Sequence, residues 1–190
     1  DADQPIPWAD QPLEFVHKFR FWFQEYTPPT PRAPPSHLNA LRTVWGLGSP
    51  VEYDVPQCAP HTPTSQCVHT ITGLGRFAGA APPAGEPPMR LIAAHFHCHA
   101  PTCLSIELFR CADQDGACMA PQLLCGEKAL HGGGGRFGED GFIAQPPCLW
   151  GHVADGFETP PNVSGATLFA VARTNSTYGH HGEMAWMQMY

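Results

Sequence analysis

Prolines and glycines interrupt this chain so often that it is expected to form no long helix. They number 22 and 19 among 190 residues and stand in almost every window where a helical pattern could develop. Apolar residues instead alternate with polar ones over short segments, as in half-buried strands. Strands are expected at Leu13–Phe23, Arg42–Leu47, Cys67–Leu74, Met89–His99, Cys103–Cys111, Gly165–Asn175 and Gly182–Tyr190. The sequence therefore predicts an all-β fold, an antiparallel β-sandwich or jelly roll.

A proline-rich segment divides the chain into an arm and a domain. Tyr26–Leu38 holds five prolines, which lack the amide donors that a strand ladder needs. We expect residues 1–40 to form an N-terminal strand and proline-rich arm, and residues 41–190 to form a disulfide-stapled β-sandwich domain. The glycine-rich segment His131–Gly141 is expected to be a turn, because no Lys-Ser/Thr pair follows it as in a phosphate-binding loop.

Cysteine usage indicates an oxidising compartment. The chain has eight cysteines and no CxxC pair, which favours disulfides over a zinc ribbon. Two cysteine pairs would close short loops, and a third would join the two flanks of the glycine-rich turn. The two remaining cysteines would form the fourth pair. The expected disulfides are Cys58–Cys67, Cys111–Cys118, Cys125–Cys148 and Cys98–Cys103.

Two N-glycosylation sequons, at Asn162 and Asn175, point to the same compartment. Together with the cysteines they predict an extracellular or cell-surface protein that carries N-linked glycans. The formal net charge of -7 and the ten Lys and Arg residues argue against a nucleic-acid partner, which normally requires a clustered basic surface. No apolar run approaches the length of a membrane span, so none is expected.

The segment "AAHFHCHAPTC" carries histidines at every second position. In an extended chain His95, His97 and His99 share one face. Imidazole ligands suit Zn, Cu, Fe or Ni, and an added thioether shifts the preference toward copper, above all Cu(I). The last strand offers three methionines, Met184, Met187 and Met189, which are otherwise core residues. Either His95 with His97 or His97 with His99 could form the His-x-His pair.

The last hundred residues resemble the C-terminal domain of the copper type II, ascorbate-dependent monooxygenases, the family of peptidylglycine alpha-hydroxylating and dopamine beta-monooxygenase. The resemblance rests on short motifs in the family's order, namely "HCH" at 97–99, "SIELF" at 105–109, "GATLFAVAR" at 165–173 and "EMAWMQMY" at 183–190. It implies one copper ion held by His97, His99 and Met184. His95, His180 and His181 are possible additional ligands.

The chain departs from that family in two respects. The family's hydroxylases hold a second copper in a separate N-terminal domain, whereas the first ninety residues here contain only His17, His37, His61 and His69. Ala185 stands where the family carries a disulfide cysteine. The resemblance therefore implies either a reduced, monooxygenase-like enzyme or a metal-holding module, and we assign no catalytic residue.

Other function classes remain as alternatives. The first is a glycosylated structural subunit of an extracellular fibre or coat, which would assemble with copies of itself by strand addition. A carbohydrate- or protein-binding module would use the tryptophans Trp8, Trp22, Trp45, Trp150 and Trp186. A hydrolase lacks a Gly-x-Ser-x-Gly elbow, and its candidate acids, Glu107, Glu127, Glu139 and Asp140, are expected to be solvated surface residues.

Overall fold

The computed structural model describes residues 16, 19, 21, 45–48, 51–75, 85, 88–99, 102–111, 118–132 and 143–190. The chain separates into two units, Asp1–Asn39 and Ala40–Tyr190, and the fold described below is that of the second. The proline-rich arm, the boundary at residue 40, the glycine-rich segment 133–142 and the acids Glu139 and Asp140 lie outside the described residues.

The strand expected at Leu13–Phe23 is absent at the three residues described there. Val16, Phe19 and Phe21 belong to no strand, and they are exposed by 78%, 76% and 79%. The rings of Phe19 and Phe21 stack with their centroids 6.4 Å apart. Alternation of apolar residues is by itself not enough for a strand, because a strand also needs a sheet partner and cover for its apolar face.

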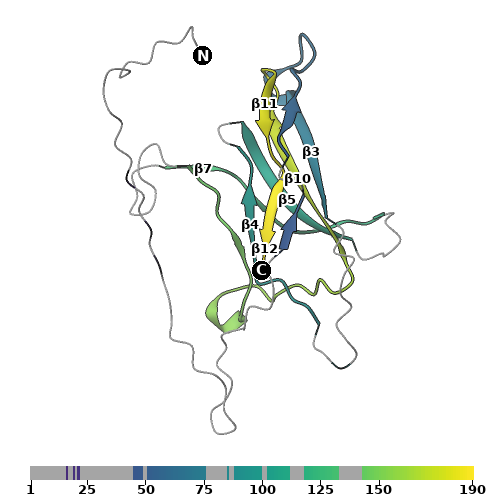
Figure 1. The fold of residues 1–190 in the computed structure, drawn as a ribbon, viewed down its shortest axis with the longest axis vertical. Coiled ribbons are helices and arrows are strands. Elements are labelled where there is room, and N and C mark those ends of the chain that lie inside the picture. Colours follow the sequence, from purple (N-terminus) through teal and green to yellow (C-terminus); the bar gives the residue numbers. More distant parts are fainter. Residues whose placement is uncertain are drawn as a thin grey trace. The chain divides into compact units, whose positions relative to one another are not determined.

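Within the described residues, the second unit is built from antiparallel sheets (Figure 1). One four-stranded sheet has the order β1 (Trp45–Leu47), β12 (Trp186–Met189), β4 (Ala93–His97) and β9 (Cys148–Leu149). The other has the order β3 (Val68–Gly75), β10 (Thr167–Asn175), β5 (Cys103–Cys111) and β6 (Gln122–Glu127). The all-β prediction is confirmed, whereas the layering of a sandwich or jelly roll stays a prediction.

Short elements complete the described part of the second unit. β2 (Tyr53–Val55) pairs with β11 (His180–Glu183), and β7 (Leu130–His131) pairs with β8 (Ile143–Ala144). Two 3-10 helices span Thr64–Gln66 and Val153–Asp155. No helix among the described residues has the length and apolar character needed to span a bilayer.

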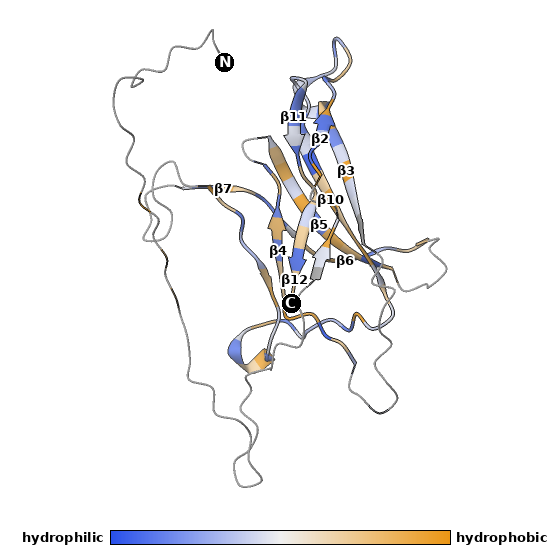
Figure 2. Ribbon diagram, in the orientation of Figure 1, coloured by the Kyte–Doolittle hydropathy of each residue, from blue (hydrophilic) through white to orange (hydrophobic). Residues whose placement is uncertain are grey.

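Side-chain alternation explains the longer strands. Along β10, Leu168, Ala170, Ala172 and Thr174 are buried, and the residues between them are half-buried. Figure 2 shows the hydropathy of each strand; β11, which contains no apolar residue, is coloured hydrophilic. Burial of one apolar face stabilises a strand by roughly 25 cal/mol for each Å² removed from water.

Buried side chains from both four-stranded sheets join in one hydrophobic cluster. Phe96 and Met187 come from one sheet, and Leu108 and Leu168 come from the other. Met187 and Met189 are 0% exposed, whereas Met184 is half-buried and lies outside the cluster. Met187 and Met189 are therefore core residues, whereas Met184 is not.

All four expected disulfides are present, and no cysteine is free. They are Cys58–Cys67, Cys98–Cys103, Cys111–Cys118 and Cys125–Cys148. The short spacing within three of the pairs made the connectivity readable, because each pair needs only a local turn.

Two glycines allow three backbone segments to meet. Gly48, after β1, has a positive φ of 87°, and Gly73 lies in β3 of the other sheet. A Cβ added at Gly48 or Gly73 would lie 2.3 Å or 2.4 Å from the carbonyl oxygen of Ala185. Only glycine permits this approach, which fixes the segment directly after Met184.

Candidate metal centre

Strand β4 carries His95 and His97, and it is paired with β12. Trp186 lies opposite His97 and Gln188 lies opposite His95, so these four side chains share one face. His95 and His97 are exposed, whereas Phe96 between them is fully buried. Extending the same register places Met184 opposite His99, just beyond the end of the ladder. The pairing therefore places the backbone of Met184 next to that of His99.

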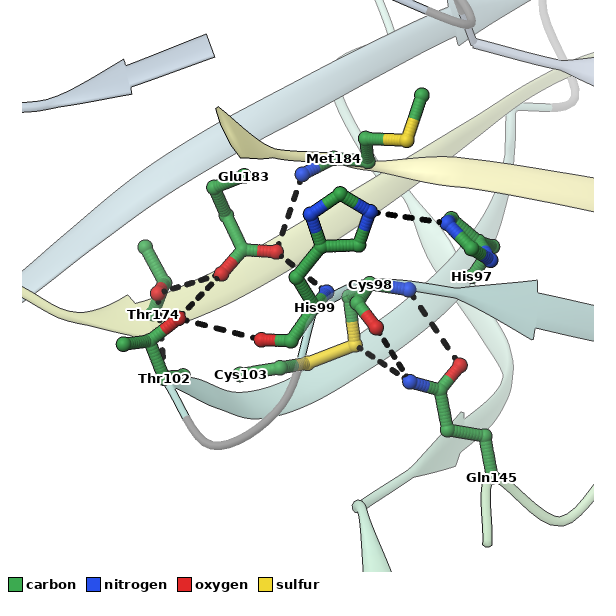
Figure 3. The surroundings of a disulfide bond; sticks show 9 residues. All are labelled: His97, Cys98, His99, Thr102, Cys103, Gln145, Thr174, Glu183 and Met184. Carbon is green, nitrogen blue, oxygen red and sulfur yellow. Dashed lines mark hydrogen bonds between the residues drawn. A yellow bond between two sulfur atoms is a disulfide. The ribbon is translucent and has the colours of Figure 1, made fainter. Parts of the chain in front are cut away.

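The imidazoles of His97 and His99 converge. Their Nε2 atoms are 3.1 Å apart, and the ring planes lie at 85° to each other (Figure 3). In metal-free protein one ring donates to the other, with the direction set by the tautomer. The ring of Trp186 lies edge to face against the ring of His97, with the two ring centroids 6.3 Å apart. His97 is exposed and His99 is half-buried.

A fully buried carboxylate, Glu183, connects His99 to Met184. Its Oε1 accepts hydrogen bonds from the backbone amides of His99 at 2.7 Å and Met184 at 3.0 Å. Its Oε2 is reached by the hydroxyls of Thr102 at 2.7 Å and Thr174 at 3.0 Å. Because one oxygen binds both amides, the backbones of the two residues are held side by side (Figure 3).

The turn after His99 is held from several directions. The His99 carbonyl accepts a hydrogen bond from the amide of Cys103, and the Cys98–Cys103 disulfide closes the same turn. Gln145 binds the backbone of Cys98 through both ends of its side-chain amide, donating to the carbonyl and accepting from the amide. The residue between the two imidazoles is thus fixed on both of its backbone groups (Figure 3).

Met184 supplies the only thioether of the proposed ligand set. Its side chain is half-buried and projects away from Glu183 (Figure 3). The hydrogen bond from its amide to Glu183 positions the backbone and leaves the sulfur unconstrained by that contact.

Electrostatics favour a neutral His97. Burial lowers the pKa of His97, and nearby His99 and His95 lower it further, whereas the charge of Glu183 raises it. The neutral imidazole is the form that ligates metals, so at neutral pH the ring needs no deprotonation before it can bind an ion.

His180 and His181, two of the additional candidate ligands, each contact a residue outside the proposed ligand set. His180 and His181 were expected in a turn, but they open β11, because pairing with β2 replaces the missing apolar alternation. Nδ1 of His181 contacts the carboxylate of Asp54, and Nδ1 of His180 lies 3.0 Å from the Tyr178 carbonyl. In the part of the chain that the structure describes, no group of three or more His, Cys, Asp or Glu side chains is arranged to hold a metal ion.

The structure also gives the contacts or burial of the acidic, tryptophan and sequon residues that were considered for other roles. Glu107 forms an ion pair with Arg173, and burial raises the pKa of Glu127. Trp150 is buried, in keeping with a core role. Asn162 is exposed, and Asn175 is half-buried at the end of β10, where its side-chain oxygen accepts from Thr177.

Sequence reasoning assigned no role to Glu183, although it noted the Glu-Met pair for its methionine. The available signal was a carboxylate directly before a proposed ligand, in a segment that enters an apolar strand.

Comparison with protein-family models, with curated proteins and with solved structures finds no match to this chain.

Proposed function

We propose that this protein is a secreted copper-binding domain in which His97, His99 and Met184 hold a single ion. The observation that carries the proposal is the 3.1 Å separation of the two facing Nε2 atoms. Two imidazole nitrogens, each about 2.0 Å from one ion, lie roughly this far apart in a tetrahedral site. In metal-free protein the two nitrogens share a hydrogen bond at this distance, and a bound ion would replace that bond.

The donor chemistry favours copper over other metals. Two neutral imidazoles alone fit several ions, but the half-buried thioether of Met184 favours the soft Cu(I) ion. Copper, when bound, supplies a redox-active centre. The chain's own residues hold the ligands in place, through the β4–β12 ladder, the Glu183 hydrogen bonds and the Cys98–Cys103 turn.

We propose that the domain binds copper, and we do not propose that it catalyses hydroxylation. The first ninety residues contain four scattered histidines and no His-His pair from which to build a second copper centre. The four disulfides support an oxidising, extracellular setting. In such a setting a single-copper domain would act as a metal-holding module.

Metal titration of the purified, metal-stripped protein tests this function. We expect one equivalent of Cu(I) and one of Cu(II), measured by competition with chromogenic chelators and by elemental analysis. His97→Ala and His99→Ala should each abolish stoichiometric copper. Met184→Ile should weaken Cu(I) while retaining Cu(II), because it removes only the thioether.

His131→Ala is the matched control, because His131 is exposed on β7 and is not among the proposed ligands. It should bind copper as the unsubstituted protein does. Equal losses in His131→Ala and His97→Ala, or a chain that takes up no copper, would refute the proposed function.

A second candidate is favoured by one observation about β3. This eight-residue strand lies at the edge of its sheet, and no strand among the described residues pairs with its other side. Such an edge can accept a strand from another copy, which is the structural-subunit alternative. Sizing of the full chain and of a chain lacking residues 1–40 tests it: a metal-free polymer that the deletion disperses would support it.

A further inference from the structure

We infer that Glu183 is the positioning residue of this centre and that its fixed negative charge sets which copper oxidation state the centre prefers. The inference rests on the proposed function and concerns a residue outside the ligand set. Glu183 is 0% exposed, and no Lys, Arg or His among the described residues forms an ion pair with it. A buried carboxylate is costly unless hydrogen bonds satisfy it, and Glu183 accepts two at each of its oxygens.

The hydrogen bonds give Glu183 its positioning role. One oxygen binds the amides of both His99 and Met184, which are separated by more than eighty residues in the chain. The carboxylate therefore sets the position of the His99 backbone relative to the Met184 backbone. The hydroxyls of Thr102 and Thr174 hold the other oxygen and prevent the carboxylate from rotating.

The charge of Glu183 acts at the ligands themselves. Its Oε1 lies 2.7 Å from the backbone nitrogen of His99 and 3.0 Å from that of Met184, so the charge lies beside two of the three proposed ligands. A cation held by those ligands is attracted by this charge. Because the interaction grows with the charge of the ion, it stabilises Cu(II) more than Cu(I).

Two substitutions separate charge from position. In Glu183→Gln the remaining carbonyl oxygen can still accept from both amides, and the new NH₂ group faces the two threonine hydroxyls. Those hydroxyls have other acceptors, the His99 carbonyl at 3.2 Å for Thr102 and the Thr102 carbonyl at 3.1 Å for Thr174. Glu183→Gln thus removes the charge and keeps the connections, whereas Glu183→Asp keeps the charge and shortens the reach.

The experiment measures Cu(I) and Cu(II) affinities of the full chain, with thermal unfolding recorded for every variant. Glu183→Gln should weaken Cu(II) about tenfold or more and Cu(I) much less, so that the ratio of the two affinities shifts toward Cu(I). Glu183→Asp should weaken both ions by similar factors. Thr174→Val is the control, because it removes one hydroxyl bond and leaves the carboxylate and both amide bonds; its affinity ratio should not change.

The outcomes distinguish the two proposals. If the unsubstituted protein takes up no copper, both are overturned. If it binds copper and Glu183→Gln retains the original affinity ratio, the charge role fails while the proposed function stands. If Thr174→Val shifts the ratio as much as Glu183→Gln does, Glu183 is merely a structural residue. Should Glu183→Gln not fold, unchanged affinities in Glu183→Asp would overturn the positioning role.

Discussion

Replacing Gly73 with alanine should destabilise the protein, although a glycine in a strand is normally improved by alanine. Alanine in a compatible backbone usually adds about 0.4–1 kcal/mol by restricting the unfolded chain. Gly73 has no positive φ, so its backbone suits alanine. The new Cβ would, however, lie 2.4 Å from the carbonyl oxygen of Ala185 and 3.2 Å from the Gly48 Cα.

A backbone oxygen cannot rotate away as a flexible side chain can, so the strands themselves must move. Overpacking of this kind costs about 1–3 kcal/mol, which exceeds the entropic gain. A net loss of about 1–2 kcal/mol corresponds to a fall in Tm of roughly 2–8 °C for a domain of this size. The shift also displaces Ala185, which follows Met184, so Cu(I) affinity should fall with stability.

Thermal and denaturant unfolding of Gly73→Ala measures the effect. Gly179→Ala is the matched control, because its added Cβ would meet no atom closer than 3.4 Å. The control should change the unfolding free energy by less than about 0.5 kcal/mol. A Gly73→Ala protein with a Tm equal to or above that of the original chain would refute the close-approach argument.

Three further predictions concern the turn, the imidazoles and the sequons. Replacing Cys98 and Cys103 together with serine should lower the free energy of unfolding by about 2 kcal/mol, the chain-entropy value for so short a loop; an unchanged denaturation midpoint would contradict this. In metal-free protein the lowered pKa of His97 makes the folded state bind a proton less readily than the unfolded chain. The stability that this contributes is present above the ordinary pKa of 6.5 and is lost as pH falls through the lowered value. In this pH range the free energy of unfolding of His97→Gln should therefore depend less on pH. Equal slopes in both proteins would count against the argument. Native material should carry N-glycans at Asn162 and Asn175, and mass spectrometry that finds both unoccupied would oppose the extracellular assignment.

Local features of the sequence were sufficient for the longer strands and for the disulfides. The alternation along Cys103–Cys111 predicted β5 with its observed bounds, because period-two alternation is the pattern that a sheet with one buried face imposes. The four cysteine pairs were readable for a similar reason, since most partners lie within one short turn. By contrast, β11 consists of His, His, Gly and Glu, and a strand without apolar residues gives no such signal.

The sequence alone determined that the histidines alternate on one extended segment and that a methionine follows a glutamate before the last strand. It could not determine which two imidazoles face each other, because the choice depends on the β4–β12 register and on the turn that closes at Cys103. Nor could it show that Glu183 is buried with its oxygens on His99, Met184, Thr102 and Thr174. The contacts with His99 and Thr102 join segments more than eighty residues apart. Only tertiary packing brings such groups within hydrogen-bond distance, and the candidate centre is therefore a property of the fold, whereas its ligand types are a property of the sequence.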